Sequence, residues 1–274
     1  MTYGDLLHWG KDQFSEEERK YDVETLLVHY SGLSRANLLA HLDDEASEVC
    51  ETRFKESIGA LKNDKPLQYI LGYAYFDGRC FKVNEDVLIP RFDTEVLYEF
   101  ALHCVKNGRK KVLDLCTGSG ILAISLAKEG AHVSASDVSS KALEVALENA
   151  STHQVAIDFR EGDLFSVWAN EVFDLIISNP PYIDAEGMKL LDSRVKKEPQ
   201  LALYGGEDGL DYYRKIIAQA RTYLKNTGIL AVEIAYNQGH LVSGLFEEYG
   251  FVNIVVLKDQ QGLDRVVLGS HLAV

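Results

Sequence analysis

The chain has 274 residues, of which 46% are hydrophobic and 26% charged, a composition typical of a soluble globular protein. This length suits two domains of ordinary size. The net charge of -14 argues against broad binding to nucleic-acid phosphates, which requires an excess of basic side chains. The four cysteines form no close pair, so the sequence indicates neither a metal site nor a disulfide framework and fits a reducing cytoplasm.

The N-terminus lacks a basic segment that leads into an apolar one, and no apolar run approaches the length of a membrane span. Residues 1–76 are predicted to be helical, because apolar side chains recur at spacings of three and four, as in Val23, Leu26, Leu27 and Tyr30. Acidic residues outnumber basic ones in this segment. We therefore expect a small acidic helical domain whose surface serves either solubility or the docking of a protein partner.

Residues 77–90 are expected to connect this bundle to a second domain at 91–274. Apolar and aromatic residues alternate on both sides of Asp77-Gly78, a dipeptide that tolerates the positive φ angles of a tight hairpin turn. A helix is predicted from Asp93 to Cys104, with acidic residues in its first turn. Arg91 lies two residues before this helix, directly after Pro90, and an arginine in such a place is more often a surface residue than a ligand contact.

The second domain opens with a predicted strand at 111–115, a glycine-rich turn and an apolar helix at 121–128. This order is that of the first half of a Rossmann-like unit, in which glycines let the backbone approach a ligand and the helix N-terminus offers unpaired N–H groups. Gly118, Gly120 and Ala123 also satisfy the spacing of a nucleotide-binding fingerprint. That spacing alone is a weak signal, because a similar turn can occur without a ligand.

Two further strand ends carry residues suited to an adenosine-containing ligand. Asp137 ends the predicted strand that follows the glycine-rich turn, where a carboxylate can accept hydrogen bonds from ribose hydroxyls. Alternatively, Asp137 caps the next helix, predicted at 139–150. After a third strand, Asp163 could accept a hydrogen bond from an adenine amino group while Leu164 packs against the ring.

The most specific segment is the predicted buried strand at 173–178 and the turn Asn179-Pro180-Pro181-Tyr182 that follows it. The two prolines fix φ and lack N–H groups, so the carbonyl oxygens of Asn179 and Pro180 have no sheet partner and could bind a ligand. Acceptors beside an aromatic side chain suit a neutral, planar group that bears NH2. The alternative is a tight turn with no chemical role.

The remaining sequence is consistent with an α/β fold that ends in a hairpin. A fifth buried strand is predicted at 229–234, and two β-prone runs at 251–257 and 265–268 are joined by a polar turn that contains glycine. Glu198 and Glu233 are further acidic candidates for a role in the reaction, although a glutamate at either position is more often structural.

These motifs carry a resemblance to a known family. The turn at 114–120, Asp137 and the Asn-Pro-Pro-Tyr turn resemble class I S-adenosylmethionine-dependent methyltransferases that act on amide or amino nitrogens. Further motifs narrow the resemblance to the HemK-type release-factor glutamine methyltransferases, over nearly the whole chain and most specifically over 66–214. These motifs are Pro66-x-Gln68-Tyr69-Ile70-x-Gly72, Phe76-x-Gly78-x-x-Phe81-x-Val83, Leu88-Ile89-Pro90-Arg91-x-x-Thr94-Glu95 and Glu198-Pro199-x-x-Ala202-Leu203-x-Gly205-Gly206-x-Asp208-Gly209-Leu210.

The resemblance implies a Rossmann-like methyltransferase domain with a mostly parallel seven-stranded sheet and an antiparallel final strand, preceded by the helical bundle and the hairpin. It implies catalytic roles for Asn179, Pro180, Pro181 and Tyr182, and no metal. It implies S-adenosylmethionine as the cofactor, held by Arg91, Thr94, Asp114, Cys116, Thr117, Gly118, Ser119, Gly120, Asp137, Asp163, Leu164 and Asn179. The chain departs from the family at Cys116, where glycine is usual, and this narrows the approach of the backbone to the cofactor.

The implied reaction is methyl transfer to the side-chain amide nitrogen, N5, of the glutamine in the Gly-Gly-Gln tripeptide of peptide-chain release factors. The implied setting is the cytoplasm, with no stable nucleic-acid partner and no membrane. The alternative is an adenine or guanine amino-methyltransferase that acts on nucleic acid, and the acidity of both domains counts against it. A nicotinamide-dependent oxidoreductase would explain neither the second proline nor the final hairpin.

Overall fold

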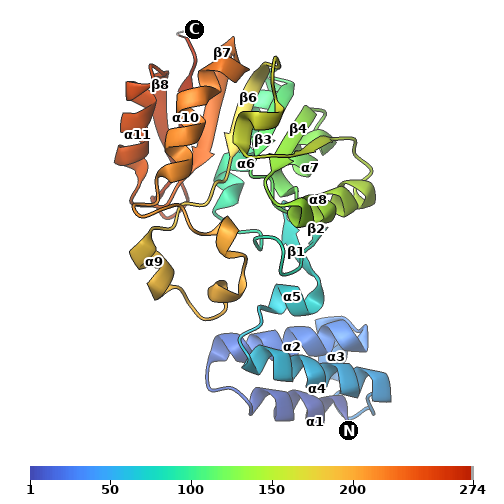
Figure 1. Cartoon of the computed structure of the whole chain (residues 1–274). Coiled ribbons are helices and arrows are strands. Elements are labelled where there is room, and N and C mark those ends of the chain that lie inside the picture. The colour runs from blue at the N-terminus through green and yellow to red at the C-terminus, as the bar shows by residue number, and fades with distance from the viewer. Residues whose placement is uncertain (273–274) are drawn as a thin grey trace. The chain divides into compact units, whose positions relative to one another are not determined.

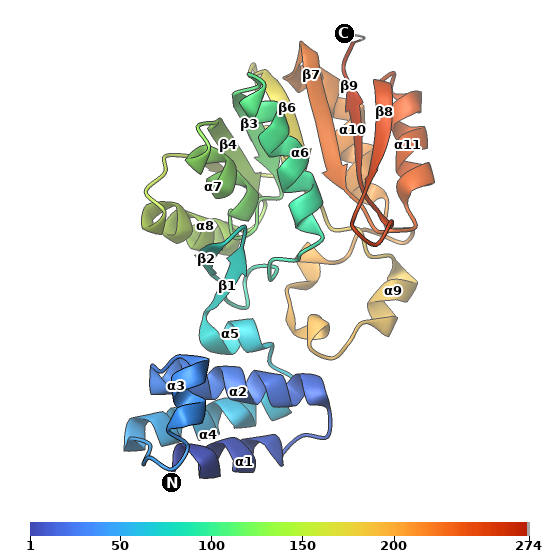
Figure 2. The ribbon, with the colours of Figure 1, turned by 180° about the vertical axis from the view of Figure 1, so that it is seen from behind.

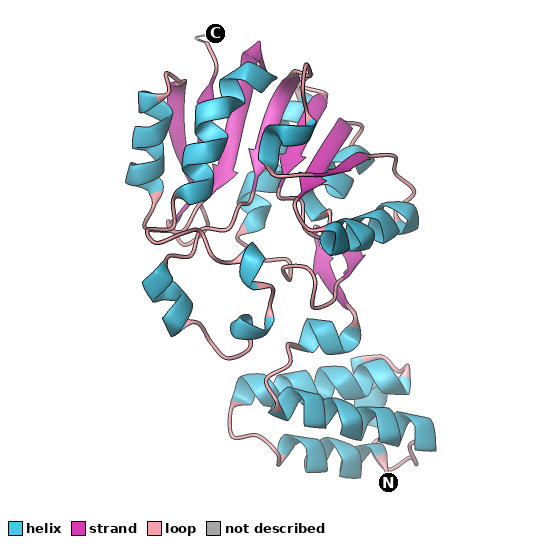
Figure 3. Cartoon of the chain, viewed as in Figure 1, coloured by secondary structure: helices cyan, strands magenta, loops and turns pink. Residues whose placement is uncertain are grey.

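The structure is a computed structural model that describes residues 1–272, and these divide into two compact units. Unit 1 comprises Met1–Gly72 together with Ser193–Lys197, and unit 2 begins at Tyr73 and holds the rest of the chain (Figure 1). All strands of the described residues belong to unit 2, whereas unit 1 is built of helices (Figure 3). None of the helices within residues 1–272 combines the length and the apolar character needed to cross a membrane.

Unit 1 is the expected helical bundle, and its helices pack around one apolar core. The first helix begins with a capping box in which Thr2 and Asp5 exchange side-chain-to-backbone hydrogen bonds. Leu26, Leu27 and Phe54 are fully buried in the core, as the three- and four-residue spacing predicts. The elements are α1 (Tyr3–Lys11), α2 (Glu17–Ser31), α3 (Arg35–Ala40), α4 (Glu48–Lys62), α5 (Leu67–Leu71) and the short 3-10 helix η2 (Val195–Lys197).

Ion pairs tie the segments of unit 1 to one another. Arg19 donates to the carbonyl oxygen of Leu61 at 2.6 Å and pairs with Asp64, so the start of α2 is held to the end of α4. Arg194, from the segment that returns to this unit late in the chain, pairs with Glu18 at 3.0 Å. A chain segment distant in sequence therefore contributes to the surface of the bundle.

Unit 2 begins with a hairpin around the expected turn, in which β1 (Tyr73–Phe76) pairs antiparallel with β2 (Arg79–Lys82). Residues 73–76 are therefore a strand, although they were predicted to belong to the helical segment. Asp77 and Gly78 form the turn, with φ angles of 48° and 68°. Positive φ at both positions is what a tight two-residue hairpin turn requires.

The main sheet has seven strands in the order β5-β4-β3-β6-β7-β9-β8. Its first five strands in this order run parallel, and β9 runs antiparallel to both of its neighbours. The predicted sheet with an antiparallel final strand is thus confirmed. The strands are β3 (Lys111–Leu115), β4 (His132–Asp137), β5 (Asp158–Glu161), β6 (Phe173–Ser178), β7 (Leu224–Glu233), β8 (Val252–Lys258) and β9 (Asp264–Ser270).

Helices cover both faces of this sheet, which explains why its central strands are continuously apolar. Val112 and Ile177 face a core shared with α6 and α7, whereas Leu113 and Ile176 face a core shared with α10 and α11. Helix α10 lies in front of the sheet in Figure 1, and α6 lies in front of it in the reverse view of Figure 2. The helices are α6 (Thr94–Lys106), α7 (Ile121–Lys128), α8 (Ser140–Thr152), η1 (Leu164–Val167), α9 (Ala185–Leu190), η3 (Gln200–Ala202), α10 (Asp211–Tyr223) and α11 (Gly239–Glu248).

One strand differs from its expected extent. The sequence predicts a strand from Ile229, but β7 begins at Leu224, which pairs with Phe173 across an irregularity in the register. Residues 225–227 are exposed and polar, so they lack the apolar pattern from which a buried strand is recognised. Their backbone nevertheless continues the strand.

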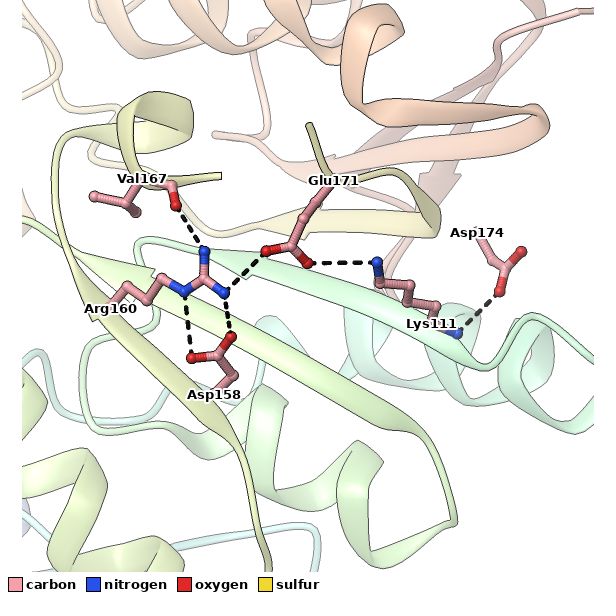
Figure 4. Close-up of polar contacts among 6 residues, drawn as sticks. All are labelled: Lys111, Asp158, Arg160, Val167, Glu171 and Asp174. Carbon is pink, nitrogen blue, oxygen red and sulfur yellow. Dashed lines mark hydrogen bonds and ion pairs between the residues drawn. The ribbon is translucent and has the colours of Figure 1, made fainter. Parts of the chain in front are cut away.

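A network of charged side chains links neighbouring strands near the end of the sheet where the parallel strands begin (Figure 4). Arg160 donates to Asp158 at 2.6 Å and to the carbonyl oxygen of Val167 at 2.8 Å, and it pairs with Glu171 at 2.9 Å. Its guanidinium group also lies 4.2 Å from the centre of the Trp168 ring. These contacts bind edge strand β5 to the segment that leads into β6.

In a second part of this network, Lys111 pairs with Glu171 at 3.4 Å, and its backbone N–H donates to Asp174 at 2.9 Å. Lys225 pairs with the other oxygen of Asp174 at 2.7 Å. The starts of β3, β6 and β7 are therefore linked through charged groups.

The turn after β3 places a non-glycine residue in a left-handed conformation. Cys116 has a φ of 60°, and Gly118 and Gly120 have φ angles of 54° and 82°. A side chain at positive φ costs roughly 1–2 kcal/mol because its Cβ crowds the following carbonyl group. The structure thus supplies a physical reason for a glycine at this position.

Replacing Arg160 with alanine should lower the free energy of unfolding of unit 2 by about 1–2 kcal/mol, because it removes a cation–π contact and several hydrogen bonds. The measurement is urea unfolding followed by tryptophan fluorescence in a Trp9→Phe background, in which Trp168 is the remaining tryptophan. The control is Arg214→Ala, since Arg214 forms exposed pairs with Asp208 and Asp211 and should contribute less than about 0.5 kcal/mol. Equal losses in the two variants would contradict this prediction.

Cys116→Gly should be more stable than Cys116→Ala by about 1 kcal/mol, because only alanine suffers the crowding at positive φ. Both variants lack the thiol, so the comparison isolates the backbone. The same two substitutions at the buried Cys104, within α6, should give the opposite order, with glycine about 1 kcal/mol less stable. Urea titration of the four variants checks this, and the same order at both sites would refute it.

Candidate active site

A cavity lies at the end of the sheet where the parallel strands finish, as the rule for open α/β sheets predicts. Its empty volume is about 990 Å³, including the open space at its mouth, which is enough for a nucleoside-sized ligand. Most of the residues singled out from the sequence line it. These are Arg91, Thr94, Asp114, Cys116, Thr117, Gly118, Ser119, Asp137, Asp163, Leu164, Asn179 and Pro181.

Three of the selected residues do not line the cavity and lie next to residues that do. Gly120 precedes α7, where an added Cβ would lie 3.0 Å from the side chain of Ile124. Pro180 is buried under the turn, and Tyr182 is half-buried and packs against the core below α10.

The turn after β3 contributes a buried acid to the cavity. Asp114 accepts a hydrogen bond at Oδ2 from the Thr117 hydroxyl group at 2.7 Å, whereas Oδ1 has no partner among residues 1–272. Burial raises the pKa of the Asp114 carboxyl group to about 7. An unpaired polar atom in a buried position indicates that the turn is arranged for a ligand that supplies a donor.

Asp137 lies at the end of β4 with its carboxylate held by the backbone. Oδ2 accepts from the N–H of Gly118 at 2.9 Å, and Oδ1 accepts from the N–H of Ser139 at 2.9 Å. The cap of α8 is Ser139, whose hydroxyl oxygen accepts from the N–H of Ala142 at 3.2 Å. Each oxygen of Asp137 keeps a second acceptor position, so the carboxylate remains available to a ligand in the cavity.

Cys116 lines the same cavity but lacks the features of a reactive thiol. Burial raises the pKa of its thiol well above the usual value, and the nearby Asp137 carboxylate adds to the effect. A thiol in this state is protonated at neutral pH and is a poor nucleophile. The residue therefore acts on the cavity through its size and backbone conformation.

The Asn-Pro-Pro-Tyr turn directly follows β6 and brings Asn179 to the cavity. The Nδ2 atom of Asn179 donates to the hydroxyl oxygen of Thr94, the first residue of α6, at 3.2 Å. With the amide nitrogen used in this way, the Oδ1 atom of Asn179 is the free acceptor. Burial raises the pKa of the Tyr182 hydroxyl group, so this side chain stays neutral.

The segment at 203–209 holds this turn from outside the sheet. Ile183 and Tyr204 form an isolated parallel bridge, in which the N–H of Gly205 donates to the carbonyl oxygen of Ile183 at 2.9 Å. A Cβ on Gly205 would lie 2.7 Å from the Cα of Tyr182, and one on Gly209 would lie 2.5 Å from its carbonyl oxygen. The two glycines thus permit a backbone approach that any side chain would block.

Gln238 completes the support of the turn. Its Nε2 atom donates to the carbonyl oxygens of Tyr182 at 3.0 Å and Gly209 at 3.3 Å, and its Oε1 atom accepts from the N–H of Ala235 at 3.0 Å. This buried amide joins the catalytic candidate turn, the glycine segment and the loop after β7.

The sequence suggested Arg91 as a cofactor contact, and the structure adds a partner for it. Glu198 is buried, accepts from the N–H of Ile89 at 3.0 Å and forms an ion pair with the Arg91 guanidinium group. Arg91 still borders the cavity, so the pair fixes its position at the rim. This partnership joins residues more than a hundred positions apart, which sequence patterns do not reveal.

Several residues of the cavity wall were missed by the sequence reasoning. Val138 and Leu201 line the cavity although each is about half exposed, and Tyr212 lines it from α10. The position of Val138 directly after Asp137 is a signal that could have identified it. Leu201 and Tyr212 reach the cavity through the path of the chain after β6, for which local periodicity offers no guide.

The four cysteines are free, and within residues 1–272 no group of three or more His, Cys, Asp or Glu side chains is arranged to hold a metal ion. The polar atoms at the cavity are instead carboxylates, hydroxyl groups, an amide and the backbone of a glycine-rich turn. This set suits an organic ligand with several hydrogen-bond donors.

Comparison with known proteins identifies relatives along the whole chain. Residues 5–72 match the family described as PrmC N-terminal domain, and residues 94–200 match the family described as Methyltransferase small domain. The ribosomal protein L11 methylase from Lactobacillus delbrueckii subsp. bulgaricus is a structural neighbour with a TM-score of 0.53 and 22% identity. The match covers 73% of this chain and 89% of that protein. It supports the fold alone.

Two curated relatives carry the same name, release factor glutamine methyltransferase. The protein of Geobacter sulfurreducens is 38% identical over 274 residues, which cover 98% of this chain and 96% of the relative. The protein of Bacillus subtilis is 36% identical over 278 residues, which cover 97% of this chain and 96% of the relative. Identity of this extent over both units shows that the chain belongs to the release factor glutamine methyltransferase family.

Proposed function

We propose that this chain transfers a methyl group from S-adenosylmethionine to the N5 amide nitrogen of the glutamine in the Gly-Gly-Gln tripeptide of peptide-chain release factors. The observation that carries the proposal is the orientation of Asn179 at the cavity. Its Nδ2 atom is engaged by Thr94, so its Oδ1 atom is left as an acceptor for an incoming NH2 group.

The residues of the cavity fit S-adenosylmethionine, which supplies a methyl group made electrophilic by a sulfonium sulfur. Asp137 would accept hydrogen bonds from the ribose hydroxyl groups, and Asp163 and Leu164 would contact the adenine. The unpaired Oδ1 atom of Asp114 and the turn at Thr117–Gly120 would face the polar amino-acid portion. Arg91, held by Glu198, would border the same pocket.

An amide nitrogen is a poor nucleophile, because its lone pair is delocalised into the carbonyl group. Asn179 Oδ1 and the carbonyl oxygen of Pro180 would accept its two hydrogens and hold the nitrogen in line with the methyl group. Both acceptors would also stabilise the positive charge that develops on nitrogen as the C–N bond forms. The bond between the methyl carbon and sulfur breaks at the same time, and its electron pair stays on sulfur, which leaves as a neutral thioether. The alkylated nitrogen is strongly acidic and releases one proton to solvent, which restores a neutral amide.

The turn that carries these acceptors is rigid, which is the property that alignment requires. Its prolines restrict φ, and Gln238 and the glycine segment hold the backbone of Tyr182. Pro181 lines the cavity, and Tyr182 would pack against the planar amide through its accessible edge. Small displacements of such groups reduce rates strongly.

Unit 1 is proposed to dock the release factor. It presents a surface rich in Asp and Glu that is not used by the cavity, and it includes a segment, Ser193–Lys197, from the loop that follows the catalytic turn. We also propose that the enzyme acts in the cytoplasm, where such a substrate is found, and that it has no stable nucleic-acid or membrane partner. The net charge of -14 agrees with a protein acceptor over nucleic acid.

The proposal is tested by incubating the chain with methyl-labelled S-adenosylmethionine and separate acceptors: an intact release factor, its Gln→Glu variant in the Gly-Gly-Gln tripeptide, a short Gly-Gly-Gln peptide and DNA. Label should enter the intact factor on glutamine N5, enter the peptide far more slowly, and be absent from the other two. Mass spectrometry locates the methyl group. Labelling of DNA, or of the glutamate variant, would overturn the proposal.

Asn179→Asp should lower kcat about 100-fold or more with a smaller change in KM, because the alignment of the amide matters most in the transition state. The substitution keeps the size and an acceptor oxygen but adds a charge and loses the donor to Thr94. Asn253→Asp is the control, since it adds the same charge at an exposed position on β8. A kcat for Asn179→Asp within threefold of the unmodified chain would remove Asn179 from the catalytic step.

Asp137→Ala should weaken S-adenosylmethionine binding by roughly 1.5 to 3 kcal/mol, the value of a charged acceptor lost from a buried hydrogen bond. Isothermal titration calorimetry measures the affinity without any acceptor present. Asp174→Ala removes a carboxylate from the opposite end of the sheet and should leave the affinity unchanged while lowering stability. An unaltered Kd in Asp137→Ala would exclude this residue from the cofactor site.

A further inference from the structure

Glu233 is a buried acid that the proposed reaction does not use. It is the last residue of β7, and its side chain is 1% exposed. Neither carboxylate oxygen forms a well-aligned hydrogen bond among residues 1–272, although the Thr94 and Asn179 side chains lie close enough to lower the pKa of the carboxyl group. An unpaired buried carboxyl group is costly, and such a group in a native structure calls for an explanation.

The register of the sheet places Glu233 beside the catalytic turn. Ser178 of β6 is the partner of Val232 of β7, so the residues that follow them, Asn179 and Glu233, lie side by side where β6 and β7 end. Thr94, from the start of α6, is the third member of this group, since it accepts the hydrogen bond from Asn179 Nδ2. All three side chains are at least partly buried.

Hydrogen bonds on both sides fix the backbone of Glu233. Its carbonyl oxygen accepts a hydrogen bond from the Tyr213 hydroxyl group at 2.9 Å. Glu233 is also paired with Val266 in the antiparallel ladder to β9, and the next N–H, that of Ile234, donates to the carbonyl oxygen of Arg265 at 2.9 Å. The backbone of Glu233 is therefore fixed at the end of β7, from which its side chain reaches Thr94 and Asn179.

We propose that Glu233 is a positioning residue: it accepts the hydroxyl hydrogen of Thr94 and thereby keeps the Thr94 oxygen turned to receive Nδ2 of Asn179. The inference rests on the proposed function, because this chain of hydrogen bonds matters only if Asn179 Oδ1 must face the substrate amide. Without Glu233 the amide of Asn179 can rotate by 180°, which would present its NH2 group to the NH2 group of the substrate.

In this arrangement the charge of Glu233 controls the orientation of the Asn179 amide. Burial raises the pKa of its carboxyl group to about 7, with Asp93 adding to this effect while Thr94, Arg265 and Asn179 oppose it. The hydroxyl groups of Tyr182 and Tyr213 also lie within its electrostatic reach. Their own pKa values are raised by burial, so both stay neutral near pH 7.

Only the ionised carboxylate is an acceptor at both oxygens. As the pH falls below about 7, Glu233 takes up a proton and can donate to Thr94, which competes with the hydrogen bond from Asn179. The rate constant kcat should therefore rise as the pH increases through this value and reach a plateau above it.

The test compares Glu233→Gln, Glu233→Ala, Thr94→Val and Thr94→Ser for kcat and KM with a release factor, for S-adenosylmethionine affinity by calorimetry, and for melting temperature. Glu233→Ala and Thr94→Val should each lower kcat about 100-fold. Glu233→Gln should lower it about 10-fold and abolish the pH step near 7, while Thr94→Ser, which keeps the hydroxyl group, should stay within threefold of the unmodified chain. Cofactor affinity should change less than threefold in the Glu233 variants.

The double variant Thr94→Val/Glu233→Ala should be no slower than either single variant, because the two residues act as one unit. Asp174→Asn is the control for loss of a carboxylate: it should leave kcat and the pH profile unchanged, although it lowers the melting temperature. If Glu233→Ala does not fold, Glu233→Gln and the Thr94 variants decide the question.

Different results would overturn the proposed function and the role of Glu233. A lack of methylation of any release factor by the unmodified chain would overturn the proposed function and this inference together. Normal methylation by the unmodified chain, with an unchanged kcat and pH profile in Glu233→Gln and additive effects in the double variant, would overturn the role of Glu233 alone.

Discussion

The parallel register of β3, β4, β6 and β7 is the constraint on which the rest of the site depends. Parallel strands end at the same edge of a sheet, and here each ends in polar residues: the turn at Cys116–Gly120, Asp137, Asn179 and Glu233. Because helices cover both faces, most of these residues reach the cavity from a buried base, and Glu233 stays fully buried behind them. A shift of one strand by one residue would turn its polar end into the core.

The two ends of the sheet differ in how their acidic side chains are paired. At the end where strands begin, Asp158, Glu171 and Asp174 are paired with arginine or lysine side chains, so their charge is compensated. At the end where the strands finish, Asp114 and Glu233 keep oxygens without a well-aligned hydrogen bond, and burial raises the pKa of both carboxyl groups to about 7. Ion pairs therefore stabilise the fold at the end where the strands begin. At the end where they finish, polar groups remain available to bind a ligand and to orient neighbouring side chains.

Rigidity at the Asn-Pro-Pro-Tyr turn comes from outside the turn as well as from its prolines. Gly205 and Gly209 bring a neighbouring backbone within reach of Tyr182, and Gln238 hydrogen-bonds to both segments. The glycine motif after Glu198 thus has a mechanical role beside the catalytic turn. Glu198 itself ties the start of that motif to Arg91 at the rim of the cavity.

The sequence by itself determined the helical bundle, the hairpin turn, the parallel strands and the polar residue at the end of each strand, because these follow from local periodicity and turn chemistry. Only the tertiary structure decided which of these residues meet. The contacts of Asn179 with Thr94, of Glu198 with Arg91 and of Gln238 with Tyr182 join distant segments and depend on strand order and helix placement. The early start of β7 and the left-handed Cys116 were likewise hidden, since backbone pairing and φ are set by neighbours that a local pattern does not contain.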